Sequence, residues 1–112
     1  MDSLNLEDLV QERRAAQTEV RRQAWLAQVR LNEADLRACL IATQRDALGI
    51  HCDDSGAFFT YKNVFFTVKF VQDLQGYPLC KIAWRIGRQE HMHHIKRDDL
   101  WDDLLDLLAT IS

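Results

Sequence analysis

The chain has 112 residues, 47% of them hydrophobic and 28% charged, with one proline and four glycines. These proportions are ordinary for a globular domain and exclude long disordered linkers, and no apolar run reaches the roughly 20 residues that span a bilayer. The net charge of −3 argues against a dedicated nucleic-acid-binding protein, and three scattered cysteines outside any CxxC spacing are typical of reduced thiols. We therefore expect one domain over residues 1–112, in the cytoplasm and without a membrane segment.

Residues 4–48 contain no glycine or proline and show helical periodicity throughout. One apolar stripe has i, i+3/i+4 spacing and comprises Leu6, Leu9, Ala16, Val20, Ala24, Ala27 and Leu31. From Trp25 onward the apolar residues move to another face, and Asn32 is a good helix N-cap. We therefore predict a turn at Asn32 between helices 4–31 and 33–48, with one unbroken helix as the alternative. Gly49 is expected to end the helical region.

Residues 57–62, 64–72 and 79–87 are rich in aromatic and β-branched side chains, as strands are. Turn-forming residues separate these runs, and such short connections favour antiparallel neighbours. The sequence therefore predicts a meander of three strands, or of four if one begins at Ile50. Residues 88–97 are compatible with either an edge strand or a basic loop.

Residues 98–111 form an acidic amphipathic pattern, with five aspartates and no basic residue. We expect a helix that inserts Trp101, Leu104, Leu105 and Leu108 against Phe66, Phe70, Ile82 and Trp84. The predicted fold is α+β: a helix or helix pair over 4–48, a three- to four-stranded antiparallel meander over 50–95, and the C-terminal helix packed on the sheet.

Candidate catalytic and metal-binding residues are few. His91 and His93 would point to the same side of a strand and are weak candidates for a zinc site, but no third ligand follows at a recognisable spacing. Cys52 lies next to His51, and neighbours in a strand face opposite ways, which disfavours a thiolate pair. We therefore predict a protein that is not an enzyme and that uses no metal or other cofactor.

The surplus of amphipathic surface in so short a chain favours a protein-binding regulator, inhibitor or adaptor, of the kind that phages and other mobile elements encode. Its N-terminal helix would serve for docking or for homodimer formation. The candidate partner-binding residues are Arg13, Arg14, Arg21, Arg22, Trp25, Phe65, Lys69, Lys81 and Arg85. The first alternative is a nucleic-acid-binding regulator, because Lys69, Lys81 and Arg85 would share a sheet face with Phe65. A metal-binding protein that uses His91 and His93 is a further alternative.

Overall fold

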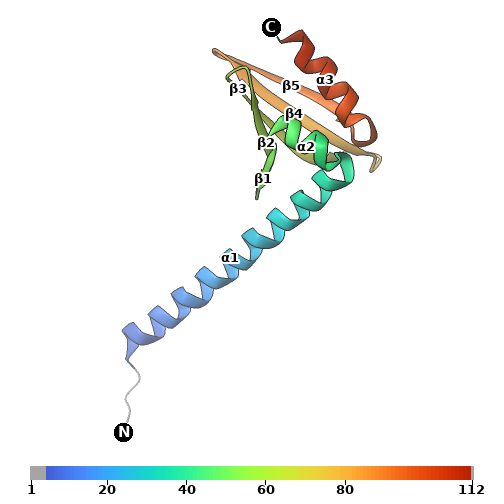
Figure 1. The fold of residues 1–112 in the computed structure, drawn as a ribbon. Helices are drawn as coiled ribbons and strands as arrows, with labels where there is room; N and C mark the ends of the chain where they lie inside the picture. Colours follow the sequence, from blue (N-terminus) through green and yellow to red (C-terminus); the bar gives the residue numbers. More distant parts are fainter. Residues whose placement is uncertain (1–4, 112) are drawn as a thin grey trace.

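The computed structural model describes residues 5–111 and shows an α+β fold with a single antiparallel sheet (Figure 1). The elements are α1 (Leu6–Cys39), α2 (Ala42–Leu48), β1 (His51–Asp53), β2 (Gly56–Tyr61), β3 (Val64–Gln72), β4 (Pro78–Ile86), β5 (Gln89–Lys96), the 3-10 turn η1 (Arg97–Asp99) and α3 (Leu100–Thr110). Leu4, which the sequence places at the start of the first helix, lies outside the described residues. The α+β class and the antiparallel sheet are confirmed.

Helix α1 runs without interruption through the position where the sequence predicts a turn. Asn5 caps its start, with the side-chain oxygen accepting a hydrogen bond from the Glu7 amide at 3.0 Å. The predicted break at Asn32 is wrong, because the Asn32 amide donates instead to the backbone carbonyl of Asp53 at 2.8 Å. The alternative of one helix to residue 48 is also wrong, since Leu40 and Ile41 are extended and separate α1 from α2.

The sheet has five strands in the order β1-β2-β3-β4-β5, so the prediction of three to four strands is wrong. The two edge strands are the short β1 and the basic β5. Strand β5 pairs with β4 along its whole length, from Gln89 opposite Ile86 to Lys96 opposite Leu79. Tight turns join the strands. Lys62 and Asn63 both have positive φ, the geometry of a two-residue type I′ hairpin turn between β2 and β3.

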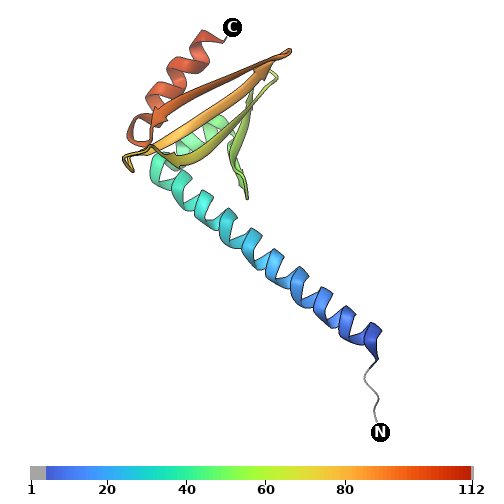
Figure 2. The same cartoon turned by 180° about the vertical axis from the view of Figure 1, so that it is seen from behind.

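The two faces of the sheet differ in what covers them. The core face holds buried side chains from β2 to β5, including Phe59, Phe66, Ile82 and Ile95. Leu36 of α1, Leu40 just after its end, and Leu100, Leu104 and Leu108 of α3 belong to the same buried cluster. Seen from behind, the strands lie in front of α2 and α3, so these helices share one side of the sheet (Figure 2).

The buried side of α3 differs in part from the prediction. Leu104 and Leu108 are buried as expected, and Trp101 is partly buried, but Leu105 is 42% exposed and Leu100 takes its place in the core. The 3-10 turn η1 precedes α3, so the helix begins at Leu100. Leu100, Leu104 and Leu108 follow one another at four-residue spacing from that start, so these three side chains face the core.

The molecule is elongated because most of α1 extends away from the rest. Its dimensions are 72 × 32 × 31 Å and its radius of gyration is 19.8 Å, whereas about 13 Å is typical of a compact chain of this length. We call residues Leu6–Leu31 the arm and residues Asn32–Ile111 the body. Figure 1 shows the arm reaching far beyond the sheet.

Candidate binding surfaces

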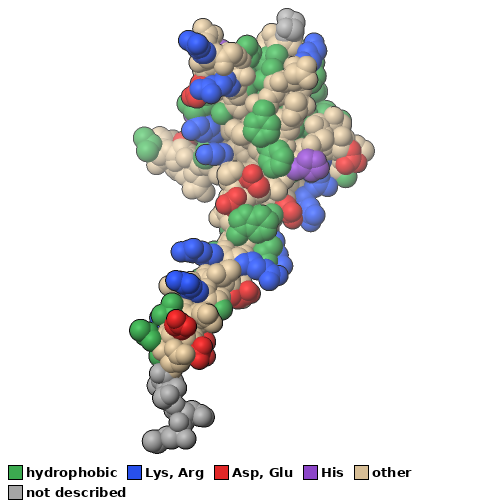
Figure 3. Space-filling model, turned by 90° about the vertical axis from the view of Figure 1, so that its left-hand side faces the viewer, with side chains coloured by type: hydrophobic (Ala, Val, Ile, Leu, Met, Phe, Trp, Pro, Cys, Tyr) green, Lys and Arg blue, Asp and Glu red, His purple; other side chains and the backbone are tan. Residues whose placement is uncertain are grey.

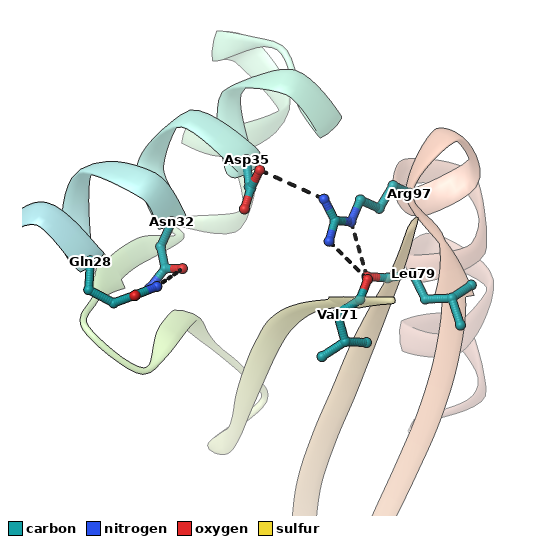
Figure 4. Close-up of polar contacts among 6 residues, drawn as sticks. All are labelled: Gln28, Asn32, Asp35, Val71, Leu79 and Arg97. Atoms are coloured by element: carbon teal, nitrogen blue, oxygen red, sulfur yellow. Dashed lines mark hydrogen bonds and ion pairs between the residues drawn. The ribbon is translucent and has the colours of Figure 1, made fainter. Parts of the chain in front are cut away.

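Arg97 fixes the last turns of α1 to the sheet. Its guanidinium donates from Nη2 to the Val71 carbonyl at 2.9 Å and from Nε to the Leu79 carbonyl at 3.1 Å (Figure 4). Its Nη1 lies 3.7 Å from a carboxylate oxygen of Asp35 on α1, and the group also stacks over the Phe70 ring. One side chain therefore connects α1, β3, β4 and the segment that leads into α3.

Asn32 provides a second connection between α1 and the body. It is the only buried polar side chain among the described residues, and it donates to Asp53 while its oxygen accepts from Gln28 at 3.2 Å. Figure 4 shows Gln28 and Asn32 on consecutive turns of α1. Together with Arg97, this contact sets the direction in which the arm leaves the body.

The apolar stripe of the arm faces away from the body. Val20 is 65% exposed and Leu31 is 60% exposed, although Leu31 is adjacent to buried Asn32. Leu36 is 4% exposed, and it lies on the opposite side of the same helix. Helix α1 therefore has one side that packs on the body and another that meets only solvent. We call the second side the arm stripe: Leu6, Leu9, Ala16, Val20, Ala24, Ala27 and Leu31.

The predicted arginine cluster lies on the arm and is exposed throughout. Arg14 and Arg21 flank one edge of the arm stripe, and Glu12 and Glu19 flank the other edge. The remaining predicted arginines are Arg13, within the stripe, and Arg22, which lies 3.9 Å from Glu19 in an exposed ion pair. Trp25 is seven residues before Asn32, so it lies on the body side of α1 and not on the stripe.

The second face of the sheet is not covered by any helix within residues 5–111. Phe65 is 54% exposed and Met92 is 56% exposed on this face. Figure 3 shows hydrophobic side chains over the sheet beside a column of lysine and arginine side chains. We call this surface the open face; its members are His51, Phe58, Phe65, Thr67, Lys69, Lys81, Ala83, Arg85, Glu90, Met92, His94 and Lys96.

Basic residues on the open face lie directly opposite one another. Lys69 of β3 pairs with Lys81 of β4, and Lys81 pairs with His94 of β5. Two acidic residues lie on this side of the sheet, and both are engaged: the Glu90 carboxylate lies 3.0 Å from the Arg85 guanidinium, and the Asp53 carboxylate accepts hydrogen bonds from the backbone amides of Ser55 and Gly56. Lys69 and Lys81 therefore concentrate positive charge on this face, and the His94 ring completes the row Lys69–Lys81–His94.

The structure places four of the nine predicted partner-binding residues on one surface: Phe65, Lys69, Lys81 and Arg85 share the open face. The five on α1 lie elsewhere. The sequence analysis did not select Phe58, His94 or Met92, which complete the face. The pairing register of β2 and β3 follows from the two-residue turn at 62–63, so it could have placed Phe58 on this face. His94 and Met92 could not be placed in the same way, because the sequence left open whether residues 88–97 form a strand.

The two candidate histidines share one face of the sheet, and the three cysteines differ in their thiol pKa: a hydrogen bond with Cys80 lowers the pKa of Cys39. His91 and His93 do share the core face, but the His91 ring stacks on Trp84 at 5.4 Å, and within residues 5–111 no group of three ligating side chains forms. Burial raises the pKa of Cys52 to about 11. A hydrogen bond with Cys39, together with burial, raises the pKa of the Cys80 thiol. These two thiols are therefore protonated near neutral pH.

Comparison with protein-family models, with curated proteins and with solved structures finds no significant match. Among the described residues, no helix is long and apolar enough to cross a membrane.

Proposed function

We propose that this protein is a non-enzymatic protein-binding module, a small regulator, inhibitor or adaptor whose arm is the docking element. The observation that carries the proposal is the exposed arm stripe, with Leu6, Val20 and Leu31 all more than half exposed. The arm spans about 38 Å at 1.5 Å per residue. Apolar surface of this length, unused by the fold, is typical of an interface. The raised pKa values of the Cys52 and Cys80 thiols support a role without catalysis.

We propose a second copy of the chain as the partner of the arm. The arm carries five arginines against four acidic residues, so two arms do not repel each other strongly. Ala16, Ala24 and Ala27 would let two helices approach closely. In a parallel pair the acidic edge of one stripe, at Glu12 and Glu19, would meet the basic edge of the other. The bodies would then project outward, because each lies on the side of α1 opposite its stripe.

The body would present the open face to further partners, so the dimer would act as a two-headed adaptor. Free thiols at Cys39, Cys52 and Cys80 suit a reducing compartment, and the proposal therefore places the module in the cytoplasm.

Light scattering combined with gel filtration tests the dimer. We expect a mass of twice 13.1 kDa for the native chain at micromolar concentration. Val20→Glu should give a monomer, because it places a charge in the seam of two apolar stripes. Its matched control is Thr18→Glu, the same charge on an exposed position of the opposite side of the arm, which should stay dimeric.

Two results would contradict the proposal: a native chain that is monomeric at high micromolar concentration, or a Val20→Glu variant that remains a dimer. Circular dichroism of both variants checks that the body remains folded. Neither substitution touches the body, so its strand and helix signals should persist.

A further inference from the structure

We propose that the open face binds single-stranded nucleic acid, through stacking on Phe58 and Phe65 and through phosphate contacts with the row Lys69–Lys81–His94. This goes beyond the proposed dimer, since the site lies wholly in the body. Phe58 and Phe65 are on neighbouring strands with ring centroids 5.8 Å apart, and His51 lies 6.1 Å beyond Phe58 on β1. Three adjacent rings on an open antiparallel sheet form a platform on which bases stack irrespective of their sequence.

The basic row is the second observation. Like charges directly opposite in a sheet destabilise it, and among the described residues no acidic side chain forms an ion pair with Lys69, Lys81 or His94. A chain of phosphates relieves this repulsion and neutralises the lysines. Lys69 is four residues from Phe65 on the same strand, about 13 Å away. A single strand of nucleic acid whose bases stack on these rings therefore brings its phosphates next to the row Lys69–Lys81–His94.

The acidic overall charge does not contradict this site, because the charge is segregated. The aspartates of residues 98–106 belong to η1 and α3, and α3 packs on the core face. The open face itself is basic: Lys69, Lys81, Arg85 and Lys96 outnumber Glu90 and Asp53, and Glu90 is paired with Arg85.

The shape of the face favours nucleic acid over an acidic protein helix. A helix binds in a groove lined by aliphatic side chains. The open face offers instead flat rings beside a shallow concavity lined by Thr67, Lys81, Ala83 and Met92, among others. Such a surface receives a planar base and leaves its phosphate next to a lysine.

Fluorescence anisotropy tests the site with labelled oligouridine and oligothymidine of about 12 nucleotides, a length within the usual range for one sheet platform. We expect binding of the single strands that weakens with salt, and weaker binding of a duplex of equal length. Phe65→Ala should weaken binding by about 5- to 100-fold, as loss of one stacked base does. The pair Lys69→Ala/Lys81→Ala should reduce the slope of log K against log salt by about 1.4, at roughly 0.7 per phosphate contact.

Matched controls remove the same kinds of side chain at positions outside the open face. Tyr77→Ala deletes an exposed ring in the β3–β4 loop, and Lys62→Ala/Arg45→Ala deletes two basic groups from a turn and from α2; both should bind as the native chain does. The Val20→Glu variant should also bind, which separates this site from the dimer.

Three outcomes overturn the inference. The first is no binding of either oligonucleotide at about 50 mM salt, where phosphate contacts are strong. The second is equal loss in the control and test variants. The third is binding of polyglutamate, but of neither oligonucleotide, with the same dependence on Phe65, which would assign the face to an acidic protein.

Discussion

The arm and the body use apolar residues in opposite ways. In the body, Phe66, Ile82 and Leu104 have no exposed surface, and every helix contributes to one side of the sheet. In the arm, side chains of the same kind lie in solvent. Both regions include parts of one continuous helix, so the difference does not come from helical propensity. It depends on whether the chain itself provides a second surface against which the apolar side chains can pack.

The difference indicates where the chain depends on another molecule. Most of the stability of helices in proteins comes from packing of an apolar side against another surface. The body supplies this packing at Leu36 and Leu40. For the arm, the same stabilisation requires a partner, which in our proposal is a second arm.

Two leucines on α1 give the sharpest test of the comparison. Leu36→Ala should lower the free energy of unfolding by about 2–5 kcal/mol, because it leaves a cavity between α1 and the sheet. Leu31→Ala, five residues earlier, removes the same atoms from an exposed position and should change stability by less than about 0.5 kcal/mol. Urea unfolding followed by circular dichroism measures both values.

The measurement is made in the Val20→Glu background, so that dimer formation does not contribute to the stability of either variant. Equal losses for the two substitutions would show that the arm packs on the body, contrary to the distinction drawn between them. In the native background Leu31→Ala should instead weaken the dimer.

Arg97 and Arg85 compare a connection within the body with a contact on its surface. Arg97→Met leaves the carbonyls of Val71 and Leu79 without their charged donor, and we expect a loss of about 2 kcal/mol. Arg85→Met removes an exposed ion pair with Glu90, for which less than about 1 kcal/mol is expected. Thermal unfolding should rank the two variants in this order, and an equal shift would argue against Arg97 as the link between α1 and the sheet.

Local patterns predicted the elements whose partners lie nearby in the sequence. The strands at β2, β3 and β4 match the aromatic runs closely, and the C-terminal helix at 98–111 corresponds to α3 at Leu100–Thr110. In each case the periodicity reflects a single buried face. The exposed arm stripe was recognised as a stripe, but the sequence did not reveal that it faces away from the body.

The errors arose where a side chain acts on a distant part of the chain. Asn32 has the local preference of an N-cap, but its amide bonds to Asp53 across 21 positions. The β5 strand has few β-branched residues because only Ile95 of its side chains is buried, and its other positions apart from Met92 are polar. For the candidate site, the sequence supplied Phe65, Lys69, Lys81 and Arg85, while the role of His94 required the register of β5 with β4.

A further prediction concerns Cys52, on β1 where the body meets α1. Burial raises its pKa from 9.0 to about 11, so at pH 8 the thiolate should be about 100-fold scarcer than in the unfolded chain. Alkylation by iodoacetamide, resolved by peptide mass spectrometry, should accelerate with pH up to about 11. Because unfolding would release this proton between pH 9 and 11, stability should decline over that interval. A midpoint below 8 would instead make the Cys52 thiolate available near neutral pH, and it would remove one support for a non-catalytic role.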